Sequence, residues 1–115
     1  MIAVIFEFEP HAEHRQTYLE LAAGLRSHLE KIDGFISIER FQSLTDENRI
    51  LSLSFWRDEA AVAEWRNLSV HRAAQEQGRN KLFKDYRLRV AGVIRDYGKD
   101  NRAGVPADSL AVHRS

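Results

Sequence analysis

The chain has 115 residues, 43% of them hydrophobic, a length that suits one ordinary domain with a single core. Its 17 basic and 17 acidic side chains cancel, so no overall electric field favours nucleic acid or an anionic membrane as a partner. The absence of cysteine excludes disulfides, thiolate metal sites and cysteine nucleophiles.

The N-terminal segment MIAVIFEFEP predicts a strand, because apolar residues alternate between two sides from Ile2 to Glu9 before Pro10 ends the pattern. Only five consecutive apolar residues follow Met1, and no basic leader precedes them. We therefore expect neither a signal peptide nor a membrane span, and a cytoplasmic location follows as an expectation.

A helix is predicted from His11 to Ile32, where apolar residues recur at steps of three and four. Asp33-Gly34 is the expected stop, since glycine readily takes the left-handed conformation found after helix ends. Two strands follow, Phe35 to Leu44 and Arg49 to Trp56, and the polar link of four residues between them predicts an antiparallel hairpin.

Asp58 is a candidate cap for a helix through Val62 and Trp65, and Ser69 for a shorter helix that stops at Gly78. A long strand is predicted from Tyr86 to Tyr97. Beyond it the composition becomes polar and aperiodic, so we expect a folded domain over residues 1–97 and a tail over 98–115.

This order of elements predicts an α+β fold of the ferredoxin-like type, βαββαβ, with a four-stranded antiparallel sheet and both helices on one face. The other face keeps apolar or small residues, which we expect to include Ile5, Ile50, Ser52, Trp56, Ala91 and Val93. Because a contiguous exposed apolar patch marks an interface, a homodimer with two sheets packed face to face is predicted.

The segments GFISIERFQS, ILSLSFWRDEAAVAEWRN, HRAAQEQGR and YRLRVAGVIRDY resemble the antibiotic biosynthesis monooxygenase (ABM) family, whose members are dimeric α+β barrels. The resemblance covers residues 1–97 and is most specific from Ser54 to Arg66. It implies a cofactor-independent monooxygenase or quinol oxidase that acts on an electron-rich aromatic or quinol with molecular oxygen. Haem degradation is disfavoured, because Gln75 stands where that branch of the family has its histidine ligand.

The resemblance places Trp65 at a substrate pocket between sheet and helices, although its helical spacing suits core packing equally well. His71 and Gln75 lie one turn apart on one predicted helix face. A histidine near its ordinary pKa can take a proton from a phenol or hydroquinone, which makes His71 the candidate base, with Tyr86 as a neighbouring alternative. A solvated surface histidine is the other interpretation.

Further candidates for the substrate pocket are Trp56, Arg40 and Arg79. Three arginines of the last strand, Arg87, Arg89 and Arg95, are expected either to pair with Glu7 or Glu39 across strands or to stabilise a substrate oxyanion.

His11 and His14 form a weak metal motif, HAEH, without a third or fourth ligand at a suitable spacing, so no metal is predicted. No phosphate loop, nucleophile elbow or dinucleotide fingerprint is present, and no cofactor is expected. The alternative to an enzyme is a non-catalytic small-molecule binding or stress-response module.

Overall fold

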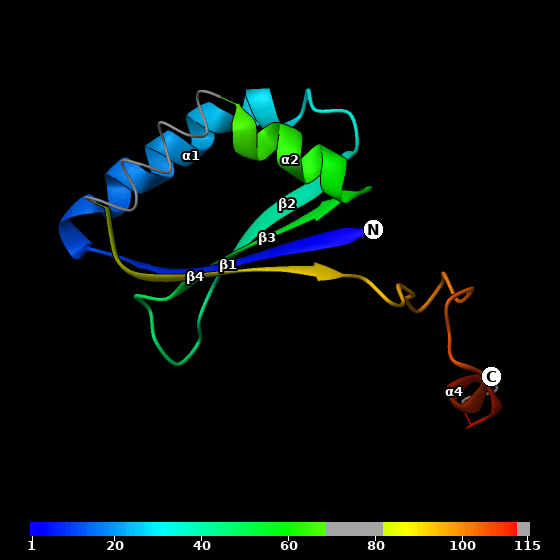
Figure 1. Cartoon of the computed structure of the whole chain (residues 1–115). Helices are drawn as coiled ribbons and strands as arrows, with labels where there is room; N and C mark the ends of the chain where they lie inside the picture. The colour runs from blue at the N-terminus through cyan, green and yellow to red at the C-terminus, as the bar shows by residue number, and fades with distance from the viewer. Residues whose placement is uncertain (69–81, 113–115) are drawn as a thin grey trace.

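The computed structural model describes residues 1–68 and 82–112 of the chain. Strand, helix, strand, strand, helix and strand follow one another, and a short helix comes last (Figure 1). No helix within these two ranges is long and apolar enough to cross a membrane. The bounds are β1 Ile2–Pro10, a 3-10 turn Ala12–His14, α1 Arg15–Leu29, β2 Phe35–Gln42, β3 Ile50–Trp56, α2 Glu59–Asn67, β4 Phe83–Gly92 and α4 Ala107–Val112.

The four strands form one antiparallel sheet in the order β2-β3-β1-β4. Figure 1 shows α1 and α2 together on one side of this sheet. The predicted ferredoxin-like α+β fold, with its hairpin between β2 and β3, is therefore confirmed.

The core lies between the helices and the sheet in two clusters. One cluster surrounds the buried ring of Phe8 and includes Tyr18 and Ala22 of α1. The other surrounds Trp56 and includes Ala61 and Val62 of α2. The second cluster also contains Leu29 of α1, so α1 spans both clusters while α2 packs on the second.

This arrangement corrects the predicted face of β3. Ile50, Ser52 and Trp56 are buried under the helices, whereas Leu51, Leu53 and Phe55 lie on the uncovered face and are half-buried. Ile5 is paired with Leu53 across the strands, so Ile5 does lie on the uncovered face as predicted.

Several element bounds also differ from prediction. The regular helix begins at Arg15 after a 3-10 turn rather than at His11. β4 begins at Phe83 and ends at Gly92 rather than at Tyr97. Just after β4, the Val93 N–H donates a 2.9 Å hydrogen bond to the Met1 carbonyl, next to the start of β1. The residues after Val93 extend beyond that end of β1.

The remaining differences lie near the C-terminus. The helix predicted from Ser69 to Gly78 lies outside the described residues. In the part of the tail that the structure describes, residues 98–112, there is a short helix, α4, which the aperiodic composition does not predict.

Gly34 has the left-handed conformation that its position after α1 predicts, with φ +94°. Its carbonyl accepts a 2.7 Å hydrogen bond from the Arg57 N–H, which joins this turn to the end of β3. The turn and the start of α2 are therefore held together.

Candidate functional site

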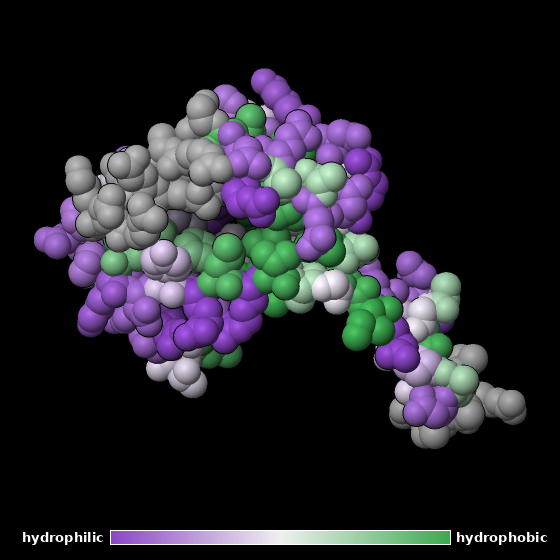
Figure 2. Space-filling view, in the orientation of Figure 1, coloured by the Kyte–Doolittle hydropathy of each residue, from purple (hydrophilic) through white to green (hydrophobic). Residues whose placement is uncertain are grey.

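An open apolar surface lies on the helix side of β4. Tyr86, Leu88 and Val90 stand opposite Phe8, Phe6 and Val4 of β1, so all six side chains share the face that the helices cover. The three β4 side chains are nevertheless 46%, 52% and 49% exposed. Figure 2 shows hydrophobic residues gathered in a band below the helix layer.

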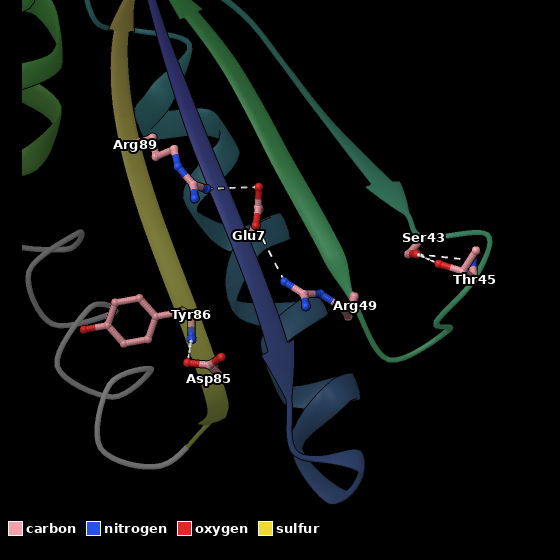
Figure 3. Close-up of polar contacts among 7 residues, drawn as sticks. All are labelled: Glu7, Ser43, Thr45, Arg49, Asp85, Tyr86 and Arg89. Carbon is pink, nitrogen blue, oxygen red and sulfur yellow. Dashed lines mark hydrogen bonds and ion pairs between the residues drawn. The ribbon is translucent and has the colours of Figure 1, made fainter.

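Aromatic rings form one end of this surface. The Tyr86 ring lies 6.0 Å from Phe6 and 6.1 Å from Phe83 between ring centres, and Phe6 stacks on Phe8 at 4.8 Å. Tyr86 thus meets Phe6 edge-to-face and Phe83 at a tilt, while part of the residue stays exposed. Figure 3 shows the ring extending from the strand on the side away from β1.

Trp65, the pocket residue implied by the family resemblance, projects from α2. It is half-buried and packs against the cluster around Trp56, as does Val4 of β1. Val4 is the strand partner of Val90. Trp65 therefore packs on the part of the core that adjoins the open β4 surface, and both proposed roles, core packing and pocket wall, are compatible with its position.

Asp58 sets the start of the helix that carries Trp65. Its carboxylate accepts a 2.9 Å hydrogen bond from the Ala61 N–H, as expected for the predicted cap, and a 3.0 Å bond from Arg57 Nε. The backbone bond, followed by the guanidinium, holds the pKa of Asp58 below its ordinary value. Bonds to Asp58 and Asp33 in turn raise the pKa of Arg57.

Two other predicted pocket residues, Trp56 and Arg40, do not lie at this surface. Trp56 is only 1% exposed, and its indole N–H donates to the Ser54 hydroxyl at 2.9 Å within the core. Arg40 stands on β2, at the opposite edge of the sheet from β4, where its Nε donates to the Tyr18 hydroxyl at 3.1 Å. His71, Gln75 and Arg79 lie outside the described residues, and their roles remain predictions.

A hollow of 410 Å³ adjoins Arg40 along β2. Its side chains come from both faces of this edge strand, from the uncovered face of β3 and from α1. They include Ile38, Phe41, Leu53 and Phe55, with Glu39 and Arg26 as charged members. Arg26 is in an ion pair with Glu30 at 2.9 Å.

The uncovered face of the sheet carries a small ion-pair network (Figure 3). The Glu7 carboxylate lies 3.2 Å from Arg89 and 3.6 Å from Arg49, and all three side chains are partly exposed. The prediction that an arginine of β4 pairs with Glu7 is confirmed for Arg89.

The HAEH motif gives no metal site in the part of the chain that the structure describes. The His11 and His14 rings lie 6.2 Å apart, and no group of three or more potential ligands occurs in residues 1–68 and 82–112.

The sheet, its helix layer and the open surface of β4 define a small ferredoxin-like α+β domain. The family described as antibiotic biosynthesis monooxygenase matches residues 1–77. The chain belongs to this family, as its sequence resemblance predicts.

Two relatives in other organisms extend the match. The jasmonate monooxygenase ABM of Pyricularia oryzae is 50% identical over 93 residues, which are 81% of this chain and 43% of that protein. The chain thus spans less than half the length of this relative. The Bacillus subtilis protein YqjZ is 32% identical over 93 residues, which are 81% of this chain and 79% of YqjZ.

Solved structures share the fold. Rv0793 from Mycobacterium tuberculosis superposes with a TM-score of 0.75 at 18% identity, over 84% of this chain and 98% of that one. A structure named antibiotic biosynthesis monooxygenase gives a TM-score of 0.70 at 15% identity, over 82% and 99% of the two chains.

Sequence reasoning places Tyr86 on the site but misses Leu88, Val90, Phe6 and Phe83. The period-two spacing of Phe6, Leu88 and Val90 does predict that they lie in strands. The spacing does not indicate that the helix layer leaves β4 uncovered, because that depends on where the helices cross the sheet.

Proposed function

We propose that this chain is a monooxygenase or quinol oxidase that uses molecular oxygen on a small, electron-rich aromatic or quinol and needs no bound cofactor. The observation that carries the proposal is the open apolar surface of Tyr86, Leu88 and Val90 beside the helix layer. A flat ring can lie against such a surface, where apolar contact supplies the affinity. Membership of the ABM family supports the oxygen chemistry.

The proposed reaction starts when a substrate hydroxyl loses its proton. Deprotonation raises the electron density of the ring, so the substrate can pass electrons to dioxygen. A quinol oxidised in this way loses two electrons and two protons, and dioxygen becomes hydrogen peroxide. A monooxygenase instead converts a ring methylene to a carbonyl, and the second oxygen atom leaves as water.

Among the described residues, Tyr86 is the candidate for the group that contacts the substrate hydroxyl and handles its proton. Its ring is fixed by Phe6 and Phe83, and 46% of the residue is exposed at the apolar surface. A phenol there can hydrogen-bond a substrate hydroxyl or relay its proton. His71 is the second candidate, on the sequence prediction alone.

The Pyricularia relative supports a second substrate class, one that would lose a proton from the carbon next to its ketone rather than from a hydroxyl. Jasmonate is a small cyclic ketone with an apolar chain and a carboxylate, and the relative named for it is 50% identical over 93 residues. The apolar surface suits the ring and chain. The carboxylate requires a cation, for which the sequence offers Arg79.

The proposed assembly is a homodimer through the uncovered sheet face. Several large apolar side chains remain at least partly exposed there, including Ile5, Leu51, Leu53, Phe55 and Phe41. Their burial against a second copy removes apolar surface from water, which stabilises association.

Oxygen consumption tests the activity. A panel of a naphthoquinol, an anthrone and jasmonate is expected to include a substrate whose oxidation the protein accelerates. Tyr86→Phe keeps the ring contacts and removes the hydroxyl, so kcat is expected to fall roughly 100-fold if the phenol handles the proton. His71→Ala tests the alternative base, and unchanged kcat in either variant removes that residue from the mechanism.

Substrate binding is tested separately. Leu88→Asp places a charge on the apolar surface and is expected to raise KM, whereas Leu44→Asp, at a side chain in the β2–β3 turn that is fully exposed, leaves it unchanged. Thermal shifts with the panel, but no oxygen uptake, would instead support the alternative of a non-catalytic binding module.

A further inference from the structure

Positive charge gathers on the uncovered face of the sheet, toward β4. The Glu7 carboxylate is shared between Arg89 of β4, at 3.2 Å, and Arg49, just before β3, at 3.6 Å (Figure 3). This network joins two guanidinium groups to one carboxylate, so it keeps an excess of positive charge. Arg87, the next β4 side chain on this face, adds to the excess, because it is exposed and forms no ion pair within residues 1–68 and 82–112.

The opposite edge of the same face carries a negative charge. Glu39 of β2 stands opposite Leu53 of β3, which lies on the uncovered face, so Glu39 lies on that face too. Its neighbour Arg40 is on the helix side, where it bonds to Tyr18. Glu39 is exposed, and in the described part of the chain it has no ion-pair partner.

The strand register puts Glu39 and Arg89 at the same height along the sheet. A single row of paired residues crosses all four strands, and its members are Glu39, Leu53, Ile5 and Arg89. The two charges are at opposite ends of this row, about 14 Å apart at the usual spacing of strands. That distance excludes an ion pair between Glu39 and Arg89 within one chain.

A second copy can bring the two charges together. In a dimer formed through the uncovered faces, a two-fold axis along the strands exchanges the edges of the sheet order β2-β3-β1-β4 and keeps every residue at its own height. Arg89 of one copy then lies over Glu39 of the other, and the same contact recurs by symmetry. An axis across the strands sets β4 on β4 instead, where the arginines of the two copies repel each other.

Closing the two faces also creates a need for this contact. Glu7, Arg49 and Arg89 are partly exposed in the single chain, so water solvates their excess charge. A second sheet displaces that water, and a charge that is buried without compensation is costly. The Arg89 guanidinium donates to Glu7 through one terminal nitrogen and has further N–H donors, so it can bind a second carboxylate.

We propose that Glu39 forms an ion pair with Arg89 of a second copy of this chain, and that this pair and its symmetric counterpart set the orientation of the dimer. The inference rests on the dimer of the proposed function and goes beyond it, because it assigns the direction of the axis and a charged contact. Apolar burial supplies the affinity, whereas the charges select one of two ways in which the same faces can pack.

Mixing two charge-reversed chains tests the contact. In a homodimer, Glu39→Arg sets arginine against arginine at both symmetric contacts, and Arg89→Glu sets carboxylate against carboxylate. Each variant is expected to weaken its homodimer by roughly 100-fold in Kd, about tenfold for each contact, in sedimentation experiments. A heterodimer of the two variants has opposite charges at both contacts. Its Kd is expected to lie within about tenfold of the wild-type value, the remainder reflecting the lost bond from Arg89 to Glu7.

Arg66→Glu provides the matched control. Arg66 is exposed on α2, in the helix layer, and its replacement makes the same change of charge away from the uncovered face. A mixture of Arg66→Glu with Glu39→Arg is expected to show no preference for the heterodimer beyond that given by the two homodimer Kd values. Native mass spectrometry compares the dimers in each mixture. A heterodimer that forms preferentially also shows that both of its chains are folded.

The outcomes separate the ion pair from the dimer and from the activity. Unchanged Kd in both single variants, or a mixture without preference for the heterodimer, overturns the ion pair and leaves the sheet dimer standing. Recovery of the Glu39→Arg chain by Arg87→Glu, but not by Arg89→Glu, overturns the assignment of Arg89. A wild-type chain that is monomeric at all concentrations overturns both the ion pair and the dimer, whereas oxygen uptake is measured independently of either.

Discussion

Replacing Gly34 by alanine tests how the turn after α1 fixes the position of α2. Gly34 has φ +94°, a conformation that side chains with a Cβ rarely adopt. An alanine Cβ would lie 2.9 Å from the Cβ of Ala61 in α2 and 3.3 Å from Arg57 Cζ. Ala61 is 2% exposed and packs in the cluster around Trp56, so the added methyl pushes on the core rather than on a mobile side chain.

The structure allows the size of the effect to be worked out. The left-handed backbone costs about 1–2 kcal/mol, and overpacking costs about 1–3 kcal/mol. The lower conformational freedom of alanine in the unfolded chain returns about 0.4–1 kcal/mol. Gly34→Ala is therefore expected to lower the free energy of unfolding by about 1–5 kcal/mol.

Urea unfolding at one fixed protein concentration measures this change, because the stability of the proposed dimer would depend on concentration. Gly24→Ala is the matched control. Gly24 lies inside α1 with no atom within 4 Å of the added Cβ, so alanine there is expected to stabilise the chain by about 1 kcal/mol. Equal midpoints for wild type and Gly34→Ala would refute the reasoning.

Two further predictions concern the core and the cap of α2. Trp56→Phe removes the donor to the buried Ser54 hydroxyl and leaves a gap, so the urea-derived free energy of unfolding is expected to fall by about 2–4 kcal/mol, with Ser54→Ala costing less. The pKa of Asp58 is lowered by folding, so its carboxylate contributes stability above its ordinary value of 3.8 and loses that contribution as pH falls through the folded-state pKa. The urea midpoints of wild type and Asp58→Asn should therefore differ near neutral pH and converge in acid; a constant gap at all pH values would contradict the assignment.

Local patterns in the sequence predict most of the fold. The strands follow from alternation of period two, the left-handed turn at Gly34 from the conformational freedom of glycine, and the start of α2 from Asp58. Each of these depends on neighbours within a few residues. Backbone conformation and capping chemistry therefore suffice to predict them without knowledge of the tertiary contacts.

The face that each side chain occupies is harder to predict. In ILSLSFW both sides of β3 are compatible with burial, and the three large residues Leu51, Leu53 and Phe55 favour the wrong side. Ser52 and Ser54 are buried under the helices, where Ser54 accepts the indole N–H of Trp56. That hydrogen bond stabilises the buried pair, and it becomes apparent only when the side chains are placed.

The candidate site likewise combines residues that the sequence predicts with residues whose position depends on tertiary contacts. The sequence predicts Trp65 and Tyr86, but it groups Arg40 with them although the strand order puts β2 and β4 at opposite edges. Arg40 instead bonds to Tyr18, which the spacing of 22 residues gives no reason to expect. Long-range partners of this kind depend on topology rather than on local pattern.

The contrasting environments of the two tryptophans give the protein a pair of built-in optical reporters. Trp56 is buried in the core, so its fluorescence is expected to shift only when the whole domain unfolds. Trp65 is half-buried and packs, like Val4, on the cluster around Trp56, so we expect an aromatic or quinone molecule on the neighbouring β4 surface to quench its fluorescence. Emission spectra of Trp56→Phe and Trp65→Phe variants would thus separate occupancy from unfolding in a single titration, without any added dye.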